Sequence, residues 1–550
     1  MTSNKRISQE TVLIAYIICY FIISLYTLTK FPFVHSDEPW LSGLTRNMLE
    51  TGNLGITETF YNLKPRFPHG IKILFHLLQM PFMIIFGYHV FSFRLLSLFF
   101  ACMSLIMFYV LLKFIFDRKD SEGRNWYPLL GTMLLSADVQ FIYAGHFARQ
   151  EILLIFCMIF AIYALLKNKI VAAAVVTGLA IGLHPNSFLI GTMCLVLLVP
   201  FGAGKVNSQI GAVKVHSQIG GGKVNPQDRL KAWKPFALYT GITGIFAVIF
   251  IGISLFFDRD FMKHYLAYGD SEFDIGAPLT NKLAEVPYFI EKIWYRVSGT
   301  YYVPEIKLEL VLFGLALIFA VIMIVLNQKC DRKEILFTLK GLTGLVVGMI
   351  IIGRYNQTSI LFVFPLFFLL LLLVIQSGFR LLVPGRVWQR NVTVLLLTLC
   401  LGASSYINIK PWMAYSYEDY IGEISKTVEP DDKVLANLNS EYYFDNGKLL
   451  DYRNLSFLKE NNRTVAEYIE ENDIEYIILS EELDFIYSQR PVWNMIYGNL
   501  RYMDELNAYT REKCVLVDSF KNKVYSVRIL QYVGSDRDFT VKIFKVKDFI

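Results

Sequence analysis

Two adjacent carboxylates, Asp37 and Glu38, follow the first long apolar run of the chain, within the segment HSDEPW. One explanation is structural: Ser36 or Asp37 caps a helix whose dipole favours acidic residues in its first turn. The other is chemical: a carboxylate at a membrane surface can take a proton from a hydroxyl group and act as a general base. Local sequence leaves both explanations open, and the chemical one makes Asp37 the candidate base.

The composition indicates that these carboxylates belong to a membrane protein. Of the 550 residues, 54% are hydrophobic and 18% are charged, whereas an ordinary soluble domain has about 25% charged residues. The mean hydropathy is +0.42. Apolar runs recur that are long enough to cross a bilayer of about 30 Å as helices. These features exclude a soluble enzyme, a disordered protein and a simple nucleic-acid-binding protein, and continuous runs argue against a membrane β-barrel.

Eleven apolar runs predict a polytopic all-α membrane domain with about eleven transmembrane helices. Lys5 and Arg6 place the N-terminus in the cytoplasm, because cytoplasmic segments are enriched in basic residues. An odd number of crossings then places the C-terminal part outside the cytoplasm. The runs cover residues 12–29, 91–116, 127–144, 152–166, 170–183, 187–201, 235–257, 308–326, 336–352, 360–375 and 392–407.

The chain divides near residue 408. Residues 1–408 hold the apolar runs, two long external loops at 30–89 and 258–307, and a cytoplasmic insertion at 202–234. The insertion is Gly-rich and repetitive (GKVNSQIGAV, KVHSQIGGG, KVNPQ), which predicts a flexible segment.

Residues 409–550 predict a soluble, extracytoplasmic α/β domain. This part is acidic, and the run RTVAEYIEEN has the periodicity of an amphipathic helix. The strands are expected at KVLANLN, EYIILS, CVLVDSF, VYSVRILQYV and FTVKIFKV.

The order of motifs in residues 7–407 resembles that of a known class of membrane enzyme. After DEPW come a helical stretch, LSGLTRNMLETGN, a Pro-rich loop, YNLKPRFPHG, an amphipathic stretch, IKILFHLLQMPFMIIFG, and Arg94 in FSFRLLSLFF. Further motifs are HFARQE, GLAIGLHPNSFLIG and GRYNQTSILFVFP. Their order, spacing and common external side resemble the membrane glycosyltransferases of the GT-C fold, in particular the branch of protein O-mannosyltransferases and the lipid A aminoarabinose transferase.

The resemblance implies transfer of a sugar from a polyprenyl-phosphate donor to an acceptor hydroxyl outside the cytoplasm. It also implies an integral protein of a bacterial cell membrane. Asp37 would be the base of an inverting reaction, and Glu38 would orient it, bind the acceptor or hold a metal. Four basic residues are expected at the donor phosphate, which arginine suits through its planar fork; they are Arg66, His69, Arg149 and Arg354. A lipid, a polysaccharide and a protein all remain possible acceptors.

Most of these residues also have simpler explanations. Arg149 and Glu151 flank a helix start, where they could form a cap and a lipid-headgroup contact, and Arg354 could reach lipid headgroups. Arg94 is expected to anchor a helix end. His184 could line the donor site or mark a helix break. Tyr355, a further site candidate, and Trp40 could be platforms for a sugar or interfacial aromatic residues.

A divalent metal ion requires that carboxylates converge. Asp37, Glu38 and Glu151 could share such an ion if they converge. No dedicated metal-binding motif accompanies them.

The main alternative function is a transporter or lipid flippase of the cell envelope. It explains the many helices, but transporter charges more often lie near the membrane midplane. A second alternative is a non-catalytic scaffold that binds partners through the C-terminal domain. A requirement for Asp37 would argue against the scaffold.

Overall fold

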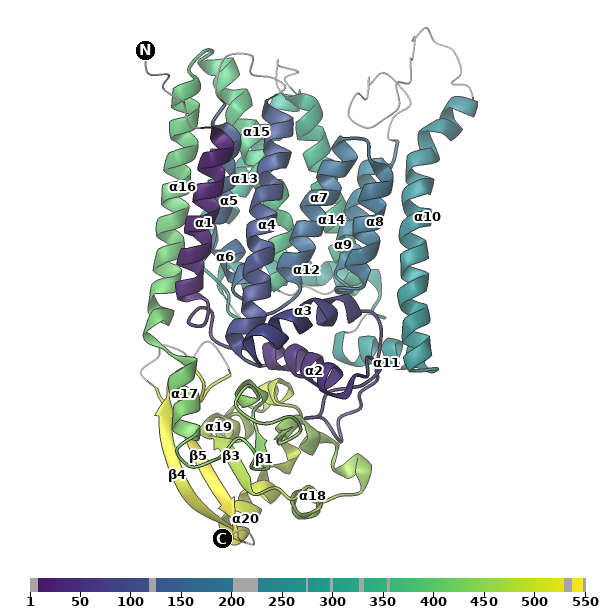
Figure 1. The fold of residues 1–550 in the computed structure, drawn as a ribbon. Helices are drawn as coiled ribbons and strands as arrows, with labels where there is room; N and C mark the ends of the chain where they lie inside the picture. The colour runs from purple at the N-terminus through teal and green to yellow at the C-terminus, as the bar shows by residue number, and fades with distance from the viewer. Residues whose placement is uncertain are drawn as a thin grey trace.

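The structure is a computed structural model that describes residues 8–117, 125–200, 226–273, 276–296, 300–325, 331–353, 357–528 and 537–547. A bundle of upright helices forms one layer, and a mixed-sheet domain lies beyond one end of it (Figure 1). Helices that run along the end of the bundle separate these two parts. The chain is thus mostly helical, and a C-terminal domain with a sheet is present, as expected.

Seven of the described helices are long and apolar enough to cross a membrane. They are α1 (Gln9–Thr27), α4 (Val90–Phe116), α10 (Pro226–Phe257), α13 (Lys307–Val325), α14 (Arg332–Ile352), α15 (Phe364–Leu382) with the preceding 3-10 turn, and α16 (Val387–Ile409). Shorter apolar helices stand upright in the same layer: α5 (Tyr127–Ser136), α7 (Glu151–Leu166), α8 (Ile170–Ile181) and α9 (Ser187–Leu198). The prediction of about eleven spanning helices is therefore supported for seven by length and composition.

One expected span is divided, and one predicted break between two spans is present. The run at 127–144 divides into α5 and α6 (Val139–Gly145), because Asp138 accepts a hydrogen bond from the backbone N–H of Phe141 (2.8 Å) and caps α6. The break between α8 and α9 lies at the HPN sequence, as predicted: Nδ1 of His184 accepts a hydrogen bond from the backbone N–H of Asn186 (3.0 Å).

The expected insertion at 202–234 is partly helical. Helix α10 begins at Pro226, and proline is favoured at the first position of a helix. The repeats in residues 201–225 lie outside the described residues.

The two long loops expected on the external side, called the first and second external loops below, contain helices that lie along the end of the bundle (Figure 1). The first loop forms α2 (Asp37–Thr51) and α3 (Ile73–Phe86), and the second forms α11 (Phe261–Phe273) and α12 (Leu279–Trp294). Thr45 of α2 hydrogen-bonds to His76 of α3 (2.8 Å), which joins the two helices. Helix α2 ends at Gly52, whose φ of +64° suits glycine.

The C-terminal domain is built on a five-stranded sheet in the order β2-β1-β3-β5-β4. The strands are β1 (Val434–Ala436), β2 (Leu449–Asp451), β3 (Tyr476–Ser480), β4 (Cys514–Asn522) and β5 (Phe539–Val546). β1 pairs in parallel with β2 and β3, whereas β5 is antiparallel to β3 and β4. The helices are α17 (Tyr417–Ile424), α18 (Val465–Glu471), α19 (Glu481–Gln489) and α20 (Met503–Lys513).

One predicted strand is wrong and one strand was not expected. Residues 524–528, the described part of VYSVRILQYV, form a turn instead of a strand. Their side chains are held by the first external loop, since the Tyr525 hydroxyl accepts a hydrogen bond from the backbone N–H of Val34 (3.2 Å). The unexpected strand, β2, has only three residues, too few for a clear alternating pattern.

Candidate active site

Asp37 is the carboxylate that faces the other polar groups at the end of the bundle. Its Oδ2 atom accepts hydrogen bonds from Arg149 Nη1 (2.8 Å) and from the Tyr301 hydroxyl. Its side chain is 19% exposed, so it is partly accessible. Neither Asp37 nor Ser36 caps α2 through its side chain, so the capping explanation fails for both residues.

The electrostatic surroundings keep Asp37 ionised. Burial by itself would raise the pKa of its carboxyl, but His35, Arg149 and the Tyr301 hydrogen bond hold that pKa below its usual range. His35 also contacts Tyr301, because the two rings stack with 4.4 Å between their centroids. Burial lowers the pKa of His35 to about 3, so this ring is neutral at physiological pH.

Glu38 has a different environment from its neighbour. Both of its oxygens accept hydrogen bonds from Arg94, Oε1 from Nε (2.7 Å) and Oε2 from Nη2 (2.8 Å). The backbone N–H groups of Ala148 and His35 also donate to them, each at 3.0 Å. Both ionic side chains are 0% exposed. The geometry therefore favours the orienting role among those expected for Glu38, because its oxygens already have partners.

Arg94 does more than anchor the end of α4. Its Nη1 atom donates to the carbonyl oxygens of Leu28 (2.8 Å) and Pro32 (2.9 Å). These bonds tie the end of the first membrane helix to α4 and to the Asp37 segment. Arg94 thus holds the segment that carries the candidate base.

Arg149 is shared between two carboxylates. Its Nη1 atom also donates to the Tyr301 hydroxyl (2.8 Å), and its Nη2 atom lies 3.0 Å from Oε1 of Glu151. Arg149 and Glu151 are buried, so they do not serve as a lipid-headgroup contact at the start of α7. The pair instead connects α7 to Asp37.

Arg66 is paired locally. Its Nε and Nη2 atoms donate to the two oxygens of Glu58, at 2.9 and 2.8 Å. Burial opposes the charge on Glu58, but Arg66 lowers the pKa of this carboxyl to about 2. The Trp40 ring packs against Arg66, with 4.9 Å from the guanidinium carbon to the ring centroid. Trp40 is thus part of a cationic cluster.

The structure supports His69 as a phosphate-binding residue less well than the sequence does. Its ring lies among aromatic side chains, 5.9 Å from Phe67 and 6.5 Å from Phe261 between centroids. Burial, together with nearby Lys72 and Arg66, lowers the pKa of His69 to about 3, so it is neutral. Arg354 and Tyr355 lie outside the described residues, and His184 holds the turn between α8 and α9.

Lys72 is a site residue that the sequence interpretation missed. It stands directly before α3 and is half-buried. Burial, reinforced by the positive charges of Arg66 and Arg149, lowers its pKa to about 8, while Glu58 and Asp37 act in the opposite direction. Its ammonium therefore lies within electrostatic range of Asp37 and Arg149, and no ion-pair partner for it occurs among the described residues.

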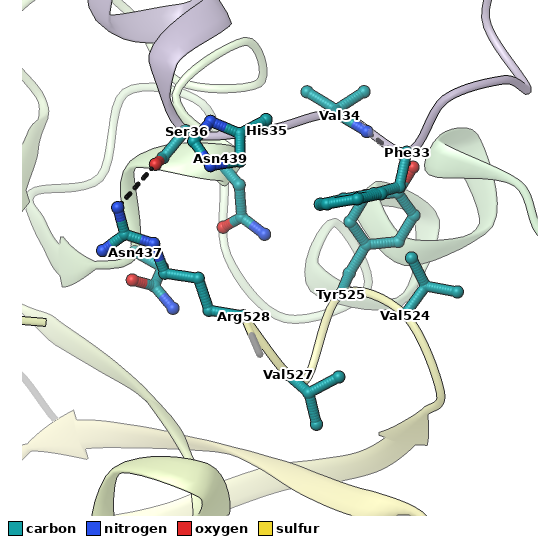
Figure 2. Close-up of a pocket in the computed structure, with 10 residues that line it drawn as sticks. All are labelled: Phe33, Val34, His35, Ser36, Asn437, Asn439, Val524, Tyr525, Val527 and Arg528. Atoms are coloured by element: carbon teal, nitrogen blue, oxygen red, sulfur yellow. Dashed lines mark hydrogen bonds between the residues drawn. The ribbon is translucent and has the colours of Figure 1, made fainter. Parts of the chain in front are cut away.

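The C-terminal domain also contributes to this site. Arg528 donates from Nη2 to the Ser36 hydroxyl (3.0 Å), directly before Asp37 in the chain (Figure 2). The Arg453 guanidinium lies 5.2 Å from the centroid of the Trp40 ring. Sequence offered no signal for these contacts, because the partners are more than 400 residues apart.

The three carboxylates proposed for a metal do not fit one. Glu38 is paired with Arg94, and Arg149 lies between Asp37 and Glu151. The described part of the chain contains no group of three or more His, Cys, Asp or Glu side chains placed to hold a metal ion. A cation would have to displace these arginines.

Comparison with known proteins identifies the fold. No family model and no curated protein matches the chain. Among solved structures, ArnT from Cupriavidus metallidurans in the apo state aligns with a TM-score of 0.53 at 12% identity, over 98% of each chain. The same protein bound to undecaprenyl phosphate aligns with a TM-score of 0.50 at 12% identity, over 97% of each chain.

A second protein of this fold class also aligns. The archaeal oligosaccharyltransferase AglB from Archaeoglobus fulgidus, in complex with an inhibitory peptide and a dolichol-phosphate, matches with a TM-score of 0.53. The identity is 12%, over 92% of this chain and 73% of AglB. At such identities the likeness is one of fold, and it confirms the expected GT-C fold.

Proposed function

We propose that this chain is an integral membrane glycosyltransferase that moves a sugar from a polyprenyl-phosphate donor to an acceptor hydroxyl on the extracytoplasmic side. The observation that carries the proposal is the contact of Asp37, a partly exposed carboxylate, with Arg149 at one end of the bundle, where Lys72 lies within electrostatic range. The fold supports it as well, since ArnT binds undecaprenyl phosphate and AglB a dolichol-phosphate.

In this mechanism Asp37 accepts the proton of the acceptor hydroxyl as the oxygen attacks the anomeric carbon of the donor sugar. The bond between that carbon and the phosphate oxygen breaks on the opposite side, so the configuration inverts. The electron pair of the broken bond goes to the polyprenyl phosphate. Arg149 and Lys72 stabilise its growing negative charge, which is the kind of preorganised stabilisation that enzymes use at a leaving group.

Arg149 links donor binding to the strength of the base. In the structure its guanidinium lowers the pKa of Asp37, which makes the carboxylate a weak base. A donor phosphate that draws Arg149 toward itself reduces this effect. The pKa of Asp37 then rises toward the operating pH, so that the base becomes effective once the donor is bound.

The transporter alternative has less support. A network of contacts lies at one end of the bundle, next to the C-terminal domain, and consists of Asp37, Arg149, Glu151 and Tyr301. It places the candidate base beside a cationic side chain. Transporter sites are more often near the midplane. Asp138 is a buried acidic residue away from this network, and it caps α6.

The test is a turnover assay on purified protein with a panel of polyprenyl-phosphate sugars, following release of free polyprenyl phosphate. Asp37→Asn should lower kcat by about 10²–10⁴-fold, the usual contribution of a general base. Asp260→Asn is the matched control, because Asp260 is an exposed carboxylate of the second external loop. Substantial turnover by folded Asp37→Asn would remove the base assignment, and no turnover by the wild type with any donor would favour a flipping assay.

A further inference from the structure

A narrow cavity lies between the segment that precedes Asp37 and the C-terminal domain (Figure 2). Its volume is about 20 Å³, which is room for one small polar group the size of a water molecule or a hydroxyl. The first external loop contributes four consecutive residues, and the C-terminal domain supplies the other walls. The lining residues are Phe33, Val34, His35, Ser36, Asn437, Asn439, Val524, Tyr525, Val527 and Arg528. Any occupant would touch both parts of the protein.

The cavity wall contains a buried hydrogen-bond donor. Nδ1 of His35 accepts a hydrogen bond from the backbone N–H of Asp37 (3.0 Å), so in the neutral ring the hydrogen is on Nε2. His35 is 3% exposed, and its Nε2 atom has no hydrogen-bond partner among the residues that the structure describes. An N–H group in this position is available to an acceptor atom of a ligand.

The wall also contains a buried acceptor. Figure 2 shows the Asn439 amide in the space between Arg528 and Tyr525. Within the described ranges, Oδ1 of Asn439 is buried and has no hydrogen-bond partner. Buried polar groups without partners cost free energy, which a suitable ligand atom would recover.

The pairing of one donor with one acceptor selects among ligand groups. A hydroxyl can accept from His35 and donate to Asn439 at the same time. An ionised phosphate or carboxylate oxygen can only accept, so it would leave Oδ1 of Asn439 without a donor, although Arg528 in the wall would attract its charge. The narrow space also suits one small group better than a whole ring.

We propose that this cavity binds a second hydroxyl of the acceptor, which makes the acceptor a carbohydrate. The inference rests on the proposed function, because it assumes that a first hydroxyl reacts at Asp37. Ser36 lines the cavity and is adjacent to Asp37 in the chain, so the two positions are close. A sugar presents neighbouring hydroxyls that can occupy both, whereas a serine or threonine side chain has only one.

The first experiment measures transfer to mannotriose, chitotriose and maltotriose, and to a serine- and threonine-containing peptide. At least one trisaccharide should be used in preference to the peptide. Asn439→Leu removes the acceptor atom at similar volume, and it should raise the KM for that trisaccharide tenfold or more while the donor KM stays within twofold. Asn461→Leu, an exposed position in the same domain, is the control.

The second experiment measures binding without turnover. In the Asp37→Asn protein, saturation-transfer NMR should detect the same trisaccharide, and adding Asn439→Leu should abolish the signal. Where the leucine variant does not fold, Asn439→Ala replaces it.

The outcomes separate the two proposals. Transfer only to the peptide, transfer to no trisaccharide, or an unchanged acceptor KM in the Asn439 variant would overturn the carbohydrate inference and leave the proposed function standing. Failure of the wild type to release polyprenyl phosphate from any donor would overturn the proposed function, and the inference with it.

Discussion

At the scale of single residues, Asp37 and Glu38 are neighbours in sequence but have separate tasks. Glu38 is enclosed with Arg94 and fixes the position of the segment, whereas Asp37 is left partly exposed. Glu38 therefore positions the segment, and Asp37 remains accessible to a substrate.

Replacing Glu38 tests this division. Glu38→Gln leaves the buried Arg94 charge without its ion-pair partner, which should lower the free energy of unfolding by about 3–5 kcal/mol. Thermal unfolding in detergent measures the change. The double variant Glu38→Gln, Arg94→Met should recover a large part of it, and a single variant as stable as the wild type would show that the pair does not hold the segment.

The pH dependence of the reaction tests Lys72. Because its pKa is lowered to about 8, the ammonium loses its proton as the pH rises through that value. We therefore expect kcat/KM to fall above about pH 8. Lys72→Arg should remove this alkaline limb, since arginine stays protonated in proteins. Lys263→Arg, at an exposed position of α11, should leave the limb in place. A limb that persists in Lys72→Arg belongs to another group.

The sequence predicted those site residues that lie within a recognisable motif. Asp37, Arg149 and Glu151 lie within short motifs at the ends of helices, and the structure brings all three together. Lys72, Tyr301 and Arg528 could not be found in this way. Their roles depend on contacts between distant segments, and a lone tyrosine or lysine in a loop has no distinctive pattern.

At the scale of elements, the second external loop completes the site begun by the first. Tyr301 lies between α12 and α13, and it contacts both Asp37 and Arg149. Its ring also stacks on His35. The segment after α12 therefore has to be in place for the base to be held.

Tyr301→Phe tests this contribution while keeping the ring. The loss of a hydrogen bond to a charged group, worth about 1.5–3 kcal/mol, should lower kcat by about 10–100-fold. The unfolding temperature should fall by only a few degrees, because the stacking on His35 remains. Tyr295→Phe is the control, since that side chain is 66% exposed. Equal kcat in the wild type and Tyr301→Phe would place Tyr301 outside the mechanism.

The sequence predicted correctly that the apolar elements are helices, but it predicted their number less well. Long runs such as α4 and α13 have clear hydropathy, whereas the expected span at 127–144 is divided by the cap that Asp138 forms. In the C-terminal domain, the turn at 524–528 has the composition of a strand. Its conformation is set by tertiary contact, which a local pattern does not contain.

At the scale of the whole molecule, the C-terminal domain holds the first external loop in shape. Asn454 is fully buried and accepts hydrogen bonds from the backbone N–H groups of Asn62, Leu63 and Lys64. It also donates to the carbonyl oxygen of Phe60 (2.8 Å). One side chain of the C-terminal domain thus satisfies four backbone groups of the loop that carries Arg66.

Asn454→Ala should therefore loosen a loop almost 400 residues away. Three backbone N–H groups lose this partner, while the Phe60 carbonyl keeps its bond from the Asp451 backbone N–H (3.2 Å). We expect a loss of about 2 kcal/mol or more in stability, with faster proteolysis between residues 60 and 66. Limited proteolysis followed by mass spectrometry identifies the cleavage position. Asn461→Ala, whose amide bonds only to the nearby Phe457 carbonyl, is the control. Unchanged cleavage at 60–66 would contradict the clamping role.

The contact between Val34 and Tyr525 sets an order of events during biosynthesis. The two residues are 491 positions apart, and at about 5–20 residues per second the ribosome needs roughly 25–100 s to make the intervening chain. The Asp37 segment is thus made early but acquires its final partners only after Tyr525 has been made. A nascent chain that ends before this residue would carry the candidate base without the groups that position it, so activity would begin only once residues 525–528 are in place.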